Sequence, residues 1–599
     1  MRWPTFCLIL TASLLIGCTQ PDEPYGFDEA PPSASLPIGR VQGDGATSPY
    51  LDQYVEIRGV VTGNFVSGLD GFFMQDAVGE EDGDDATSDG IFVEWKSGSE
   101  PRVRRGDRIR AAGTVVEVER GGSQQTTLRA TAIEVLGRGA VAATVLDGPP
   151  AQESDWERYE GMWLRINLPL TVTGNDGLLR FGELVTAFGP RQFTPTELQP
   201  PGPAAQALDA DNRRRRLVLD DNRDGEYPDT LWFLPEPLSA DAPLRAGSIV
   251  HGVEGILQHR FGWRLQLTAE LERIEQAPRP AAPELPDGIR VAAFNVFNWF
   301  NGDGQGRGFP TPRGAANVDE MNRQRDKLVS AILGLKPDVA ALMEVENDGF
   351  GRSSALAQLV TALNAQWPEA EYAPVDAGKG PGEDVMRVAM IYRQPRLQLH
   401  GEAATLAEGA FADRNRVPLA QSFALPGDDA VFTVVANHFK SKGCNEAEQA
   451  DSDQRDGQVC WNATRSAAAQ ELHDWLATDP TASGSKAHVI LGDLNSYAQE
   501  DPLRLLHDAG WRDAFAQAGI KRPYSYNFRG ASGRLDHALL SPALAPALRA
   551  AAIWHINADE SEAFDYQRRN RQKQWYAPDP YRSSDHDPLI LVLDFGQDP

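Results

Sequence analysis

Short apolar runs in this sequence end in Asn, Asp, Glu or His, the residue types that bind divalent cations and transfer protons in hydrolytic sites. The run Val489-Ile490-Leu491 ends at Gly492 and is followed by Asp493 and Asn495 in the string AHVILGDLNS. By itself, this string is equally compatible with a strand that ends in an Asx turn. Strand alternation places Asp493 and Asn495 on one side of the chain, at the mouth of a predicted sheet.

Five further strings repeat this arrangement. They are FNVFN at 294–298, LMEVEN at 342–347, NHFKSKGC at 437–444, GRLDH at 533–537 and SDHDP at 584–588. A site that cleaves a phosphodiester needs carboxylates and amides to hold a cation and a histidine to move a proton. The recurrence therefore favours a metal-dependent hydrolytic site over a set of unrelated turns.

The C-terminal half must position most of these side chains, and residues 288–597 alternate apolar strands with amphipathic helices. Helices are predicted at about 320–335, 354–365 and 464–477, between the predicted strands IRVAAFNV, DVAALMEV, VAMIYR, VFTVVANHF, HVILGDL and LILVLDF. The pattern is typical of an α/β domain, and the length fits a two-sheet sandwich with helices outside. The Pro-rich segment 277–287 predicts a linker ahead of this domain.

Two β-rich regions precede the linker. Residues 41–146 contain short alternating runs broken by Gly and Asp, which favours a small closed barrel. Residues 150–276 partly repeat the turn-and-strand spacing of the first region, so a second barrel is a further prediction. The basic run Arg213–Arg216 is interpreted as a solvated loop neutralised by the acidic segment Asp220–Asp224, with contact to nucleic-acid phosphates as the alternative.

Charge and length restrict the class of protein. A chain of 599 residues with 41% hydrophobic composition is predicted to form about two to four domains. The formal net charge of −28 disfavours general attraction to nucleic acid or to anionic membranes. A polyanionic substrate must therefore be bound by a local positive site or by a metal ion.

The N-terminus resembles a bacterial lipoprotein signal. Residues 1–17 include the apolar run Phe6–Ile16, and Cys18 follows as the predicted lipidation site. An ordinary cleaved signal peptide is the alternative. Residues 18–40 are rich in Pro, Ser and acids and are predicted to form a tether. Thr19 replaces the Asp that retains lipoproteins at the inner membrane, so by analogy we expect an exported outer-membrane lipoprotein, held to the membrane only by its lipid.

Cysteine usage agrees with export. Cys7 leaves with the signal and Cys18 takes lipid, which leaves Cys444 and Cys460 in one polar loop. In an oxidising compartment these two most simply form a disulfide. A zinc site is the weaker alternative, because neither cysteine has a CxxC partner.

Taken together, the strings resemble the endonuclease/exonuclease/phosphatase superfamily, and the chain from about residue 41 onward resembles bacterial extracellular nucleases of the ExeM type. The motifs that carry the resemblance are FNVFNWF, LMEVEN, RNRVPLAQSF, NHFKSKGC, GDLNSY, YSYNFRGASGRLDHAL, WHINADE and SDHDP. The resemblance implies a deoxyribonuclease-like, four-layered α/β sandwich preceded by one or two OB-like barrels. It also implies phosphoester hydrolysis with Mg²⁺, or with Mn²⁺ or Ca²⁺, on DNA or alternatively RNA. We expect a monomer.

The resemblance also assigns the metal side and the general base. Glu344 is the expected first metal ligand, with Asn295 and Asp585 beside it, although a strand-end cap is the alternative for Glu344 and for Asn295. His586 is the expected general base, because a neutral imidazole can take a proton from water. Asp536 is its expected partner and would fix the tautomer of the ring.

The remaining predicted residues contact water or phosphate. Asp493 would position or deprotonate the attacking water, and Asn495 would bind a phosphoryl oxygen. His438 would protonate the leaving oxygen or bind the phosphate, with Asp384 as the acid that orients it. Arg416 suits a bidentate contact with phosphate.

Other functions remain open within the same pattern. A phosphatase or phospholipid phosphodiesterase of the same superfamily is the first alternative, and a noncatalytic nucleic-acid-binding surface protein is the second. The second is disfavoured because the Asn, Glu, Asp and His positions are all filled. Phe297 stands where apurinic-site repair enzymes of the superfamily carry Asp, which disfavours a repair function.

Overall fold

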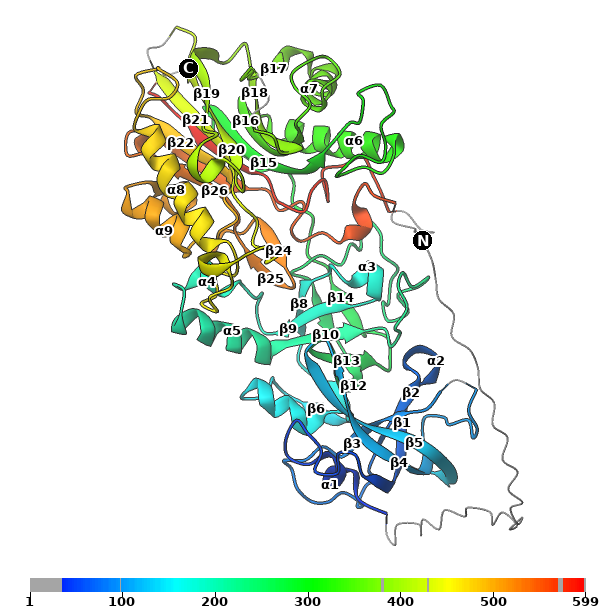
Figure 1. The fold of residues 1–599 in the computed structure, drawn as a ribbon. Helices are drawn as coiled ribbons and strands as arrows, with labels where there is room; N and C mark the ends of the chain where they lie inside the picture. The colour runs from blue at the N-terminus through cyan, green and yellow to red at the C-terminus, as the bar shows by residue number, and fades with distance from the viewer. Residues whose placement is uncertain (1–34, 97, 379–381, 428–429, 569–574, 597–599) are drawn as a thin grey trace, which may run out of the picture.

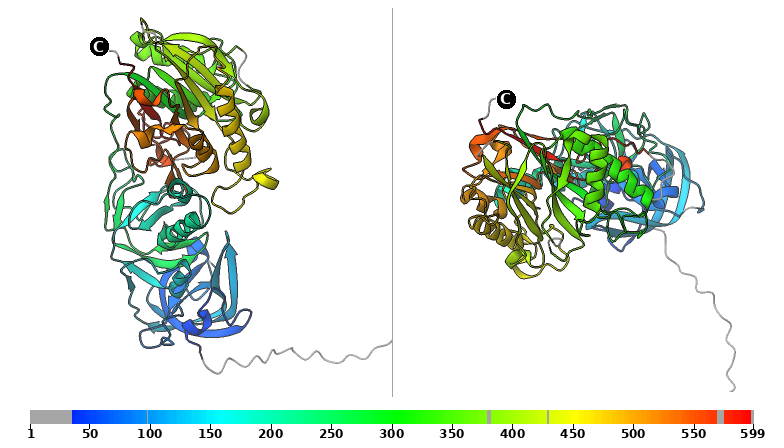
Figure 2. Two further views of the ribbon diagram at one scale, coloured as in Figure 1. Left: turned by 90° about the vertical axis from the view of Figure 1, so that its left-hand side faces the viewer. Right: turned by 90° about the horizontal axis from the view of Figure 1, so that it is seen from above.

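The computed structural model describes residues 35–96, 98–378, 382–427, 430–568 and 575–596. The predicted signal, Cys18 and almost all of the tether lie outside these residues. Three units follow one another along the chain and are stacked in the same order (Figure 1), as the side view also shows (Figure 2). None of the helices in the described ranges has both the length and the hydropathy of a membrane span.

The first unit is a closed five-stranded barrel in the order β1-β2-β3-β5-β4. Its strands are β1 (Tyr54–Phe65), β2 (Gly71–Gln75), β3 (Gly90–Glu94), β4 (Asp107–Arg120) and β5 (Ser123–Arg138), with the short helices α1 (Ile38–Gln42) and α2 (Val66–Leu69). Burial along the first nine residues of β4 alternates residue by residue, as a strand with one face on the core requires. The prediction of an all-β N-terminal region is therefore confirmed.

The barrel begins before the predicted boundary at residue 41. Leu36 forms a bridge with Ile57, and Ile38 and Val41 of α1 are buried in the barrel core. Residues 36–40 therefore belong to the barrel and not to the tether, because their apolar side chains close its end.

The second unit is a nine-stranded sheet instead of a second five-stranded barrel. Its order is β14-β11-β8-β9-β10-β13-β12-β7-β6. The strands are β6 (Thr144–Leu146), β7 (Trp163–Ile166), β8 (Leu170–Gly174), β9 (Leu184–Phe188), β10 (Arg216–Asp220), β11 (Ile249–His251), β12 (Val253–His259), β13 (Trp263–Leu267) and β14 (Arg273–Glu275). Three helices connect them, namely α3 (Leu178–Phe181), α4 (Pro195–Leu198) and α5 (Pro203–Arg215), after the 3₁₀ segment η1 (Glu153–Tyr159). Strand β6, predicted at the end of the barrel, pairs with β7 in this sheet.

The basic run is placed differently from its prediction. Arg213–Arg215 end helix α5 and pair with Asp209 and Asp211 one turn earlier, and also with a glutamate of η1. Neutralisation is thus confirmed for these three arginines, but their partners lie on the helix and not in the segment Asp220–Asp224. Arg216, the fourth, begins β10 and forms no ion pair with a described carboxylate.

The third unit contains two six-stranded sheets. The first, in the order β17-β18-β16-β15-β28-β27, consists of β15 (Ile289–Trp299), β16 (Val339–Glu346), β17 (Tyr372–Pro374), β18 (Met386–Arg393), β27 (Leu548–Ile553) and β28 (Leu589–Leu593). The second, in the order β19-β20-β21-β22-β26-β23, consists of β19 (Gln398–Thr405), β20 (Arg416–Ala424), β21 (Val431–His438), β22 (His488–Asp493), β23 (Arg512–Asp513) and β26 (Asp536–Leu540). A separate hairpin joins β24 (Tyr526–Phe528) to β25 (Ala531–Gly533).

Helices cover the outer faces of both sheets and complete four layers (Figure 1). They are α6 (Val318–Leu335) and α7 (Ala355–Gln366) on the first sheet, and α8 (Asn462–Leu476) and α9 (Asp501–Asp508) on the second. The short helix α10 (Ala514–Gln517) instead contributes Ala514 and Phe515 to the core between the sheets. Val291 and Ala293 of β15 point into the core between the sheets, whereas Ala292 and Phe294 point toward the helices. Both faces of the strand are apolar because both are buried.

The segment predicted as a linker is packed against the third unit. Arg279 lies 2.8 Å from the carboxylate of Glu560, and Trp554 donates its indole N–H to the carbonyl of Pro280. Further contacts hold the nine-stranded sheet to the third unit. The Arg191 guanidinium lies 2.7 Å from Asp559, whose carboxylate is buried. The second and third units therefore share a polar, buried interface.

We predict that Asp559→Ala destabilises this interface. The substitution leaves Arg191 buried without its partner, which costs about 3 kcal/mol for a pair of this kind. Thermal unfolding followed by circular dichroism should show a lower apparent Tm. The matched control is Asp594→Ala, which removes a solvent-screened pair with Arg549 and should lower Tm much less. Equal melting of the two variants would contradict the importance of the buried pair.

Candidate active site

A cavity of about 970 Å³ lies where the strand ends of the two sheets of the third unit meet. It is lined by six of the residues predicted from the sequence, namely Glu344, His438, Asp493, Asn495, Asp585 and His586. Asn295 and Asp536 are buried directly behind this lining and hydrogen-bond to it. Side chains that are up to about 300 positions apart in the sequence therefore share one site.

Strand register explains how the second sheet assembles its share. Arg416 of β20 pairs with His438 of β21, His438 pairs with Asp493 of β22, and Asp493 pairs with Asp536 of β26. These four residues form a single row across four adjacent strands. A shift of one residue in any strand would turn its side chain to the opposite face.

Backbone irregularities occur at site residues of both sheets. Glu344 has a φ of 65° at a register shift in β16, and Asn495 has a φ of 46° just after β22. Phe297 and Asn298 both have a φ of 55° at a register shift in β15. Non-glycine residues rarely adopt this left-handed conformation, which costs on the order of 1–3 kcal/mol each. Four such residues at or next to one cavity indicate that the surrounding packing holds the backbone there in an unfavourable conformation.

His586 is held by a buried carboxylate. Its Nδ1 lies 2.7 Å from Asp536 Oδ2, which also accepts a hydrogen bond from the Ser525 hydroxyl at 2.7 Å. The Tyr526 ring packs against the imidazole with 4.6 Å between ring centroids. Burial disfavours the charged ring, but Asp536 and Asp493 outweigh it and raise the pKa of His586 well above its ordinary value. The contact with Asp536 directs Nε2 of His586 toward Asp493.

Asp493 connects both sheets. Its Oδ2 accepts a hydrogen bond from Asn295 Nδ2 at 3.3 Å and lies 3.5 Å from His438 Nε2 and 3.9 Å from His586 Nε2. Its Oδ1 accepts the backbone N–H of Asn495. Burial, together with the charges of Asp536 and Glu344, raises the pKa of Asp493 to about 7, although His586 and the backbone N–H of Asn495 oppose this shift. This carboxylate is therefore close to the point where it gains or loses a proton at neutral pH.

Glu344 and Asp585 offer hard oxygen donors on the other side of the cavity. Glu344 accepts hydrogen bonds from Asn295 Nδ2 at 3.2 Å and from the backbone N–H of Asn298 at 3.0 Å. Burial and the negative charge of Asp585 raise the pKa of Glu344. Asn295 donates its amide to both Glu344 and Asp493, so its role in the structure is to hold the two carboxylates in place.

The residues present fit a magnesium-type cation. No group of three or more His, Cys, Asp or Glu side chains is arranged for metal binding in the described part of the chain. Mg²⁺ keeps several water ligands and needs only one or two carboxylates together with the substrate. Glu344 and Asp585 meet that requirement, and their mutual repulsion is the kind that a bound cation relieves.

His438 and Arg416 lie side by side, but Asp384 has a different partner from the one predicted. Burial and the nearby Arg416 charge lower the pKa of His438 well below its ordinary value, so the ring is neutral. Its Nδ1 is buried without a described hydrogen-bond partner. The Asp384 carboxylate lies 3.1 Å from Arg416 Nε, so it orients the arginine, and the carboxylate that approaches His438 is that of Asp493. Asp384 therefore does not orient His438 as predicted, because its negative charge pairs with the positive charge of Arg416 instead.

The loop beside the cavity is closed by a disulfide, as predicted. Cys444 and Cys460 are joined by an S–S bond of 2.07 Å, and Cys444 itself lines the cavity. Asn495 donates its side-chain amide to the carbonyl of Phe439, which brings this loop against the end of β22.

Several supporting residues were missed by the sequence analysis. They are Ser525, which binds Asp536; Tyr526, which packs on His586; Ser584, whose hydroxyl donates to the carbonyl of Asn295; and Asn557, whose amide donates to the carbonyl of His586. The motifs YSYNF and WHINADE contained three of them, and SDHDP contained Ser584. Their types did not distinguish them from ordinary buried polar residues, because their roles depend on contacts with distant segments.

Comparison with known proteins identifies the domain. Residues 299–586 match the Endonuclease/Exonuclease/phosphatase family. No curated protein matches the chain. Among solved structures, an endonuclease/exonuclease/phosphatase family protein from Bacteroides thetaiotaomicron is 16% identical, with a TM-score of 0.34 over 52% of this chain and 100% of that one.

Two other solved structures give similar values. The mannosyl-6-phosphatase Bt3783 of Bacteroides thetaiotaomicron VPI-5482 is 16% identical over 51% of this chain and 100% of its own, with a TM-score of 0.32. TDP2 of D. rerio, complexed with a single strand DNA product, is 13% identical over 52% of this chain and 100% of its own, with a TM-score of 0.32. With the family match, the row of strand-end residues and the two-sheet fold in agreement, the C-terminal part of this chain is a domain of the endonuclease/exonuclease/phosphatase family.

Proposed function

We propose that this protein is a divalent-cation-dependent phosphodiesterase that hydrolyses DNA outside the cytoplasm, in the manner of extracellular nucleases of the ExeM type. The observation that carries the proposal is the pair of Asp536 and His586, 2.7 Å apart, in one cavity with Asp493 and Glu344. A carboxylate-oriented histidine beside a carboxylate that titrates near neutrality supplies proton transfer, and Glu344 supplies the cation side.

The proposal gives each side chain a role that its position supports. Asp536 accepts the Nδ1 proton of His586 and thereby leaves Nε2 as the atom that takes a proton from water. Asp493 positions the water, because its Oδ2 lies between His586 and His438. His438 and Asn495, which line the same cavity, contact the phosphoryl oxygens, and Arg416 adds positive charge beside His438.

A cation held by Glu344 and Asp585 would neutralise the phosphate charge and lower the pKa of water. Without it, His586 retains its proton, because Asp536 and Asp493 raise its pKa. Positive charge near these carboxylates opposes that effect and favours the neutral base form of His586.

The cellular location is also part of the proposal. The N-terminal pattern ending at Cys18 favours a lipoprotein anchored in the outer membrane. The disulfide between Cys444 and Cys460 supports export, because such bonds persist in oxidising compartments.

A substrate panel tests the proposed function. The purified protein with Mg²⁺ should cleave plasmid DNA in preference to p-nitrophenyl phosphate or sphingomyelin. Dominant hydrolysis of p-nitrophenyl phosphate would favour a phosphatase, and dominant hydrolysis of sphingomyelin a phospholipid phosphodiesterase. Binding of DNA with no hydrolysis of any substrate would favour the noncatalytic alternative.

Substitution of His586 and of its partner Asp536 tests the assignment of the general base. His586→Ala should lower kcat for DNA cleavage by about 100-fold or more, the usual contribution of general-base catalysis. Asp536→Asn should cause a loss of similar size, because the amide no longer fixes the productive tautomer. His473→Ala, which removes a histidine on α8 whose Nδ1 accepts from Trp511, should retain activity. Retained activity in His586→Ala would refute this assignment.

Removal of the cation tests the other side of the cavity. Chelation with EDTA should abolish plasmid cleavage, and added Mg²⁺ should restore it. Glu344→Gln should raise the Mg²⁺ concentration needed for half-maximal rate by about tenfold or more, because one charged ligand is lost. The control is Glu346→Gln in the same strand, whose carboxylate accepts the backbone N–H of Asn301 and does not line the cavity. Cleavage that persists in EDTA would contradict the metal dependence.

A further inference from the structure

One wall of the catalytic cavity is built by the nine-stranded sheet unit. Arg216, at the start of β10, lines the same cavity as Glu344 and His586. Phe528 and Arg529, at the tip of the β24–β25 hairpin, line it as well. The cavity therefore extends from the reactive carboxylates to a surface shared by two units of the chain.

The nine-stranded sheet unit holds this hairpin in place. Asn527 donates its amide to the carbonyl of Thr173 at 2.7 Å, and the N–H of Thr194 donates to the carbonyl of Ser532 at 2.9 Å. A side chain at Gly530 would collide with Val185, so the hairpin tip lies directly against β9. These contacts fix the backbone on both sides of Phe528.

Phe528 remains uncovered despite this fixed backbone. Its side chain is 53% exposed within the cavity lining, and the Arg529 guanidinium lies 5.2 Å from the centre of its ring. An exposed aromatic ring held on a rigid hairpin beside an arginine matches the platforms on which proteins stack nucleic-acid bases.

Arg216 and Arg529 are both among the arginines that line the cavity. Burial lowers the pKa of Arg216, and the charge of Arg529 contributes to the lowering, although Asp209 opposes it. Neither arginine forms an ion pair with a carboxylate in the described part of the chain, whereas Arg213, Arg214 and Arg215 all do. In a protein of net charge −28, two neighbouring guanidinium groups without an ion pair offer local positive charge to an anionic ligand.

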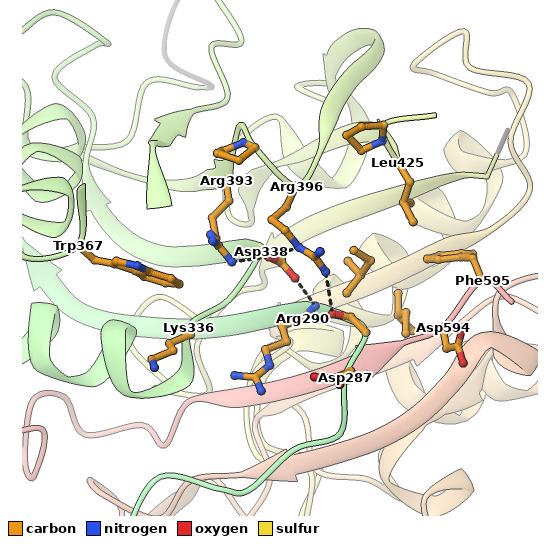
Figure 3. Close-up of a pocket in the computed structure, with 15 residues that line it drawn as sticks. Asp287, Arg290, Lys336, Asp338, Trp367, Arg393, Arg396, Leu425, Asp594 and Phe595 are labelled. Atoms are coloured by element: carbon orange, nitrogen blue, oxygen red, sulfur yellow. Dashed lines mark hydrogen bonds and ion pairs between the residues drawn. The ribbon is translucent and has the colours of Figure 1, made fainter. Parts of the chain in front are cut away.

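The other large cavity of the third unit shows the contrast (Figure 3). There Asp338 accepts a hydrogen bond from Arg393 at 3.0 Å and lies 3.4 Å from Arg396 Nε. Arg393 also packs over the Trp367 ring, 4.3 Å from its centre. Arg393 and Arg396 of that cavity are thus already paired with a carboxylate, unlike Arg216 and Arg529.

We propose that Phe528, Arg529 and Arg216 form a subsite for the nucleotide next to the reactive phosphate, with the base on Phe528 and its phosphate between the two arginines. This inference rests on the proposed hydrolysis of phosphodiesters and narrows the substrate to a polynucleotide strand with accessible bases. It also makes the nine-stranded sheet unit part of substrate binding, because that unit supplies Arg216 and docks the hairpin.

Binding and hydrolysis together test the subsite in the full protein. Fluorescein-labelled oligothymidylate and oligouridylate are titrated in EDTA, and Kd is measured by fluorescence anisotropy for Phe528→Ala and Arg216→Gln. Each substitution should weaken binding about tenfold, as expected for the loss of one stacking or phosphate contact. With Mg²⁺, the ratio of kcat/KM for the oligonucleotide to kcat/KM for bis(p-nitrophenyl) phosphate should fall about tenfold in both variants. Tighter binding of oligothymidylate identifies DNA as the source of the nucleotide, and tighter binding of oligouridylate identifies RNA.

Matched controls separate this effect from a general loss of charge or of aromatic surface. Phe261→Ala removes a phenylalanine that is 57% exposed beside Arg260, away from the cavity. Arg213→Gln removes a paired arginine of the same basic run. Both controls should bind oligonucleotide like the unsubstituted protein.

The outcomes distinguish this inference from the proposed function. If Phe528→Ala and Arg216→Gln bind and cleave oligonucleotide like the unsubstituted protein, the subsite is refuted, while hydrolysis of bis(p-nitrophenyl) phosphate still supports a phosphodiesterase. If the unsubstituted protein hydrolyses neither compound, the proposed function fails, and the anisotropy data alone decide the subsite. If the unsubstituted protein binds neither oligothymidylate nor oligouridylate, the proposed subsite is refuted.

Discussion

The arrangement of the site depends on the second carboxylate oxygen of Asp493. Asn295 of the first sheet donates to this atom, and the rings of His438 and His586 approach it from two other segments. A buried carboxylate is stable only if such donors surround it. The same burial raises its pKa to about 7, so the contact that joins the two sheets also creates a group able to exchange protons at neutral pH.

The two sheets reach this point in different ways. The second sheet uses regular register, since His438, Asp493 and Asp536 follow one another across adjacent strands whose pairing is unbroken. The first sheet uses distortion, because Glu344 reaches the cavity only where its strand leaves regular pairing and adopts a φ of 65°. Regular strand pairing by itself fixes a row of side chains. A residue with a strained backbone conformation keeps that conformation only while the residues packed around it hold it in place. We therefore expect the cation side to depend more on surrounding packing than the proton-transfer side does.

The sequence predicted those parts of the structure that are encoded locally. The long helices and the apolar strands follow from periodicity, and the residues Glu344, Asp493 and His586 follow from their position at strand ends. Strands β20 and β26 were not predicted as strands, although their motifs were recognised, because polar residues interrupt their apolar pattern. The sequence could not predict the partner of Asp384, nor that Arg216 alone of the run Arg213–Arg216 lines the cavity, since each depends on a contact between segments far apart in the sequence.

The strong negative charge of the chain gives the unpaired arginines their significance. A protein of net charge −28 repels a polyanion at long range, so its attraction must come from charges that their own surroundings leave uncompensated. The last three arginines of α5 are compensated, and Arg213 illustrates this through its pairing with Asp209 on the same helix. Arg216 follows Arg213 by three positions, but it begins β10, lines the cavity and forms no ion pair with those acids. The end of α5 thus decides which charge is structural and which is available to a ligand.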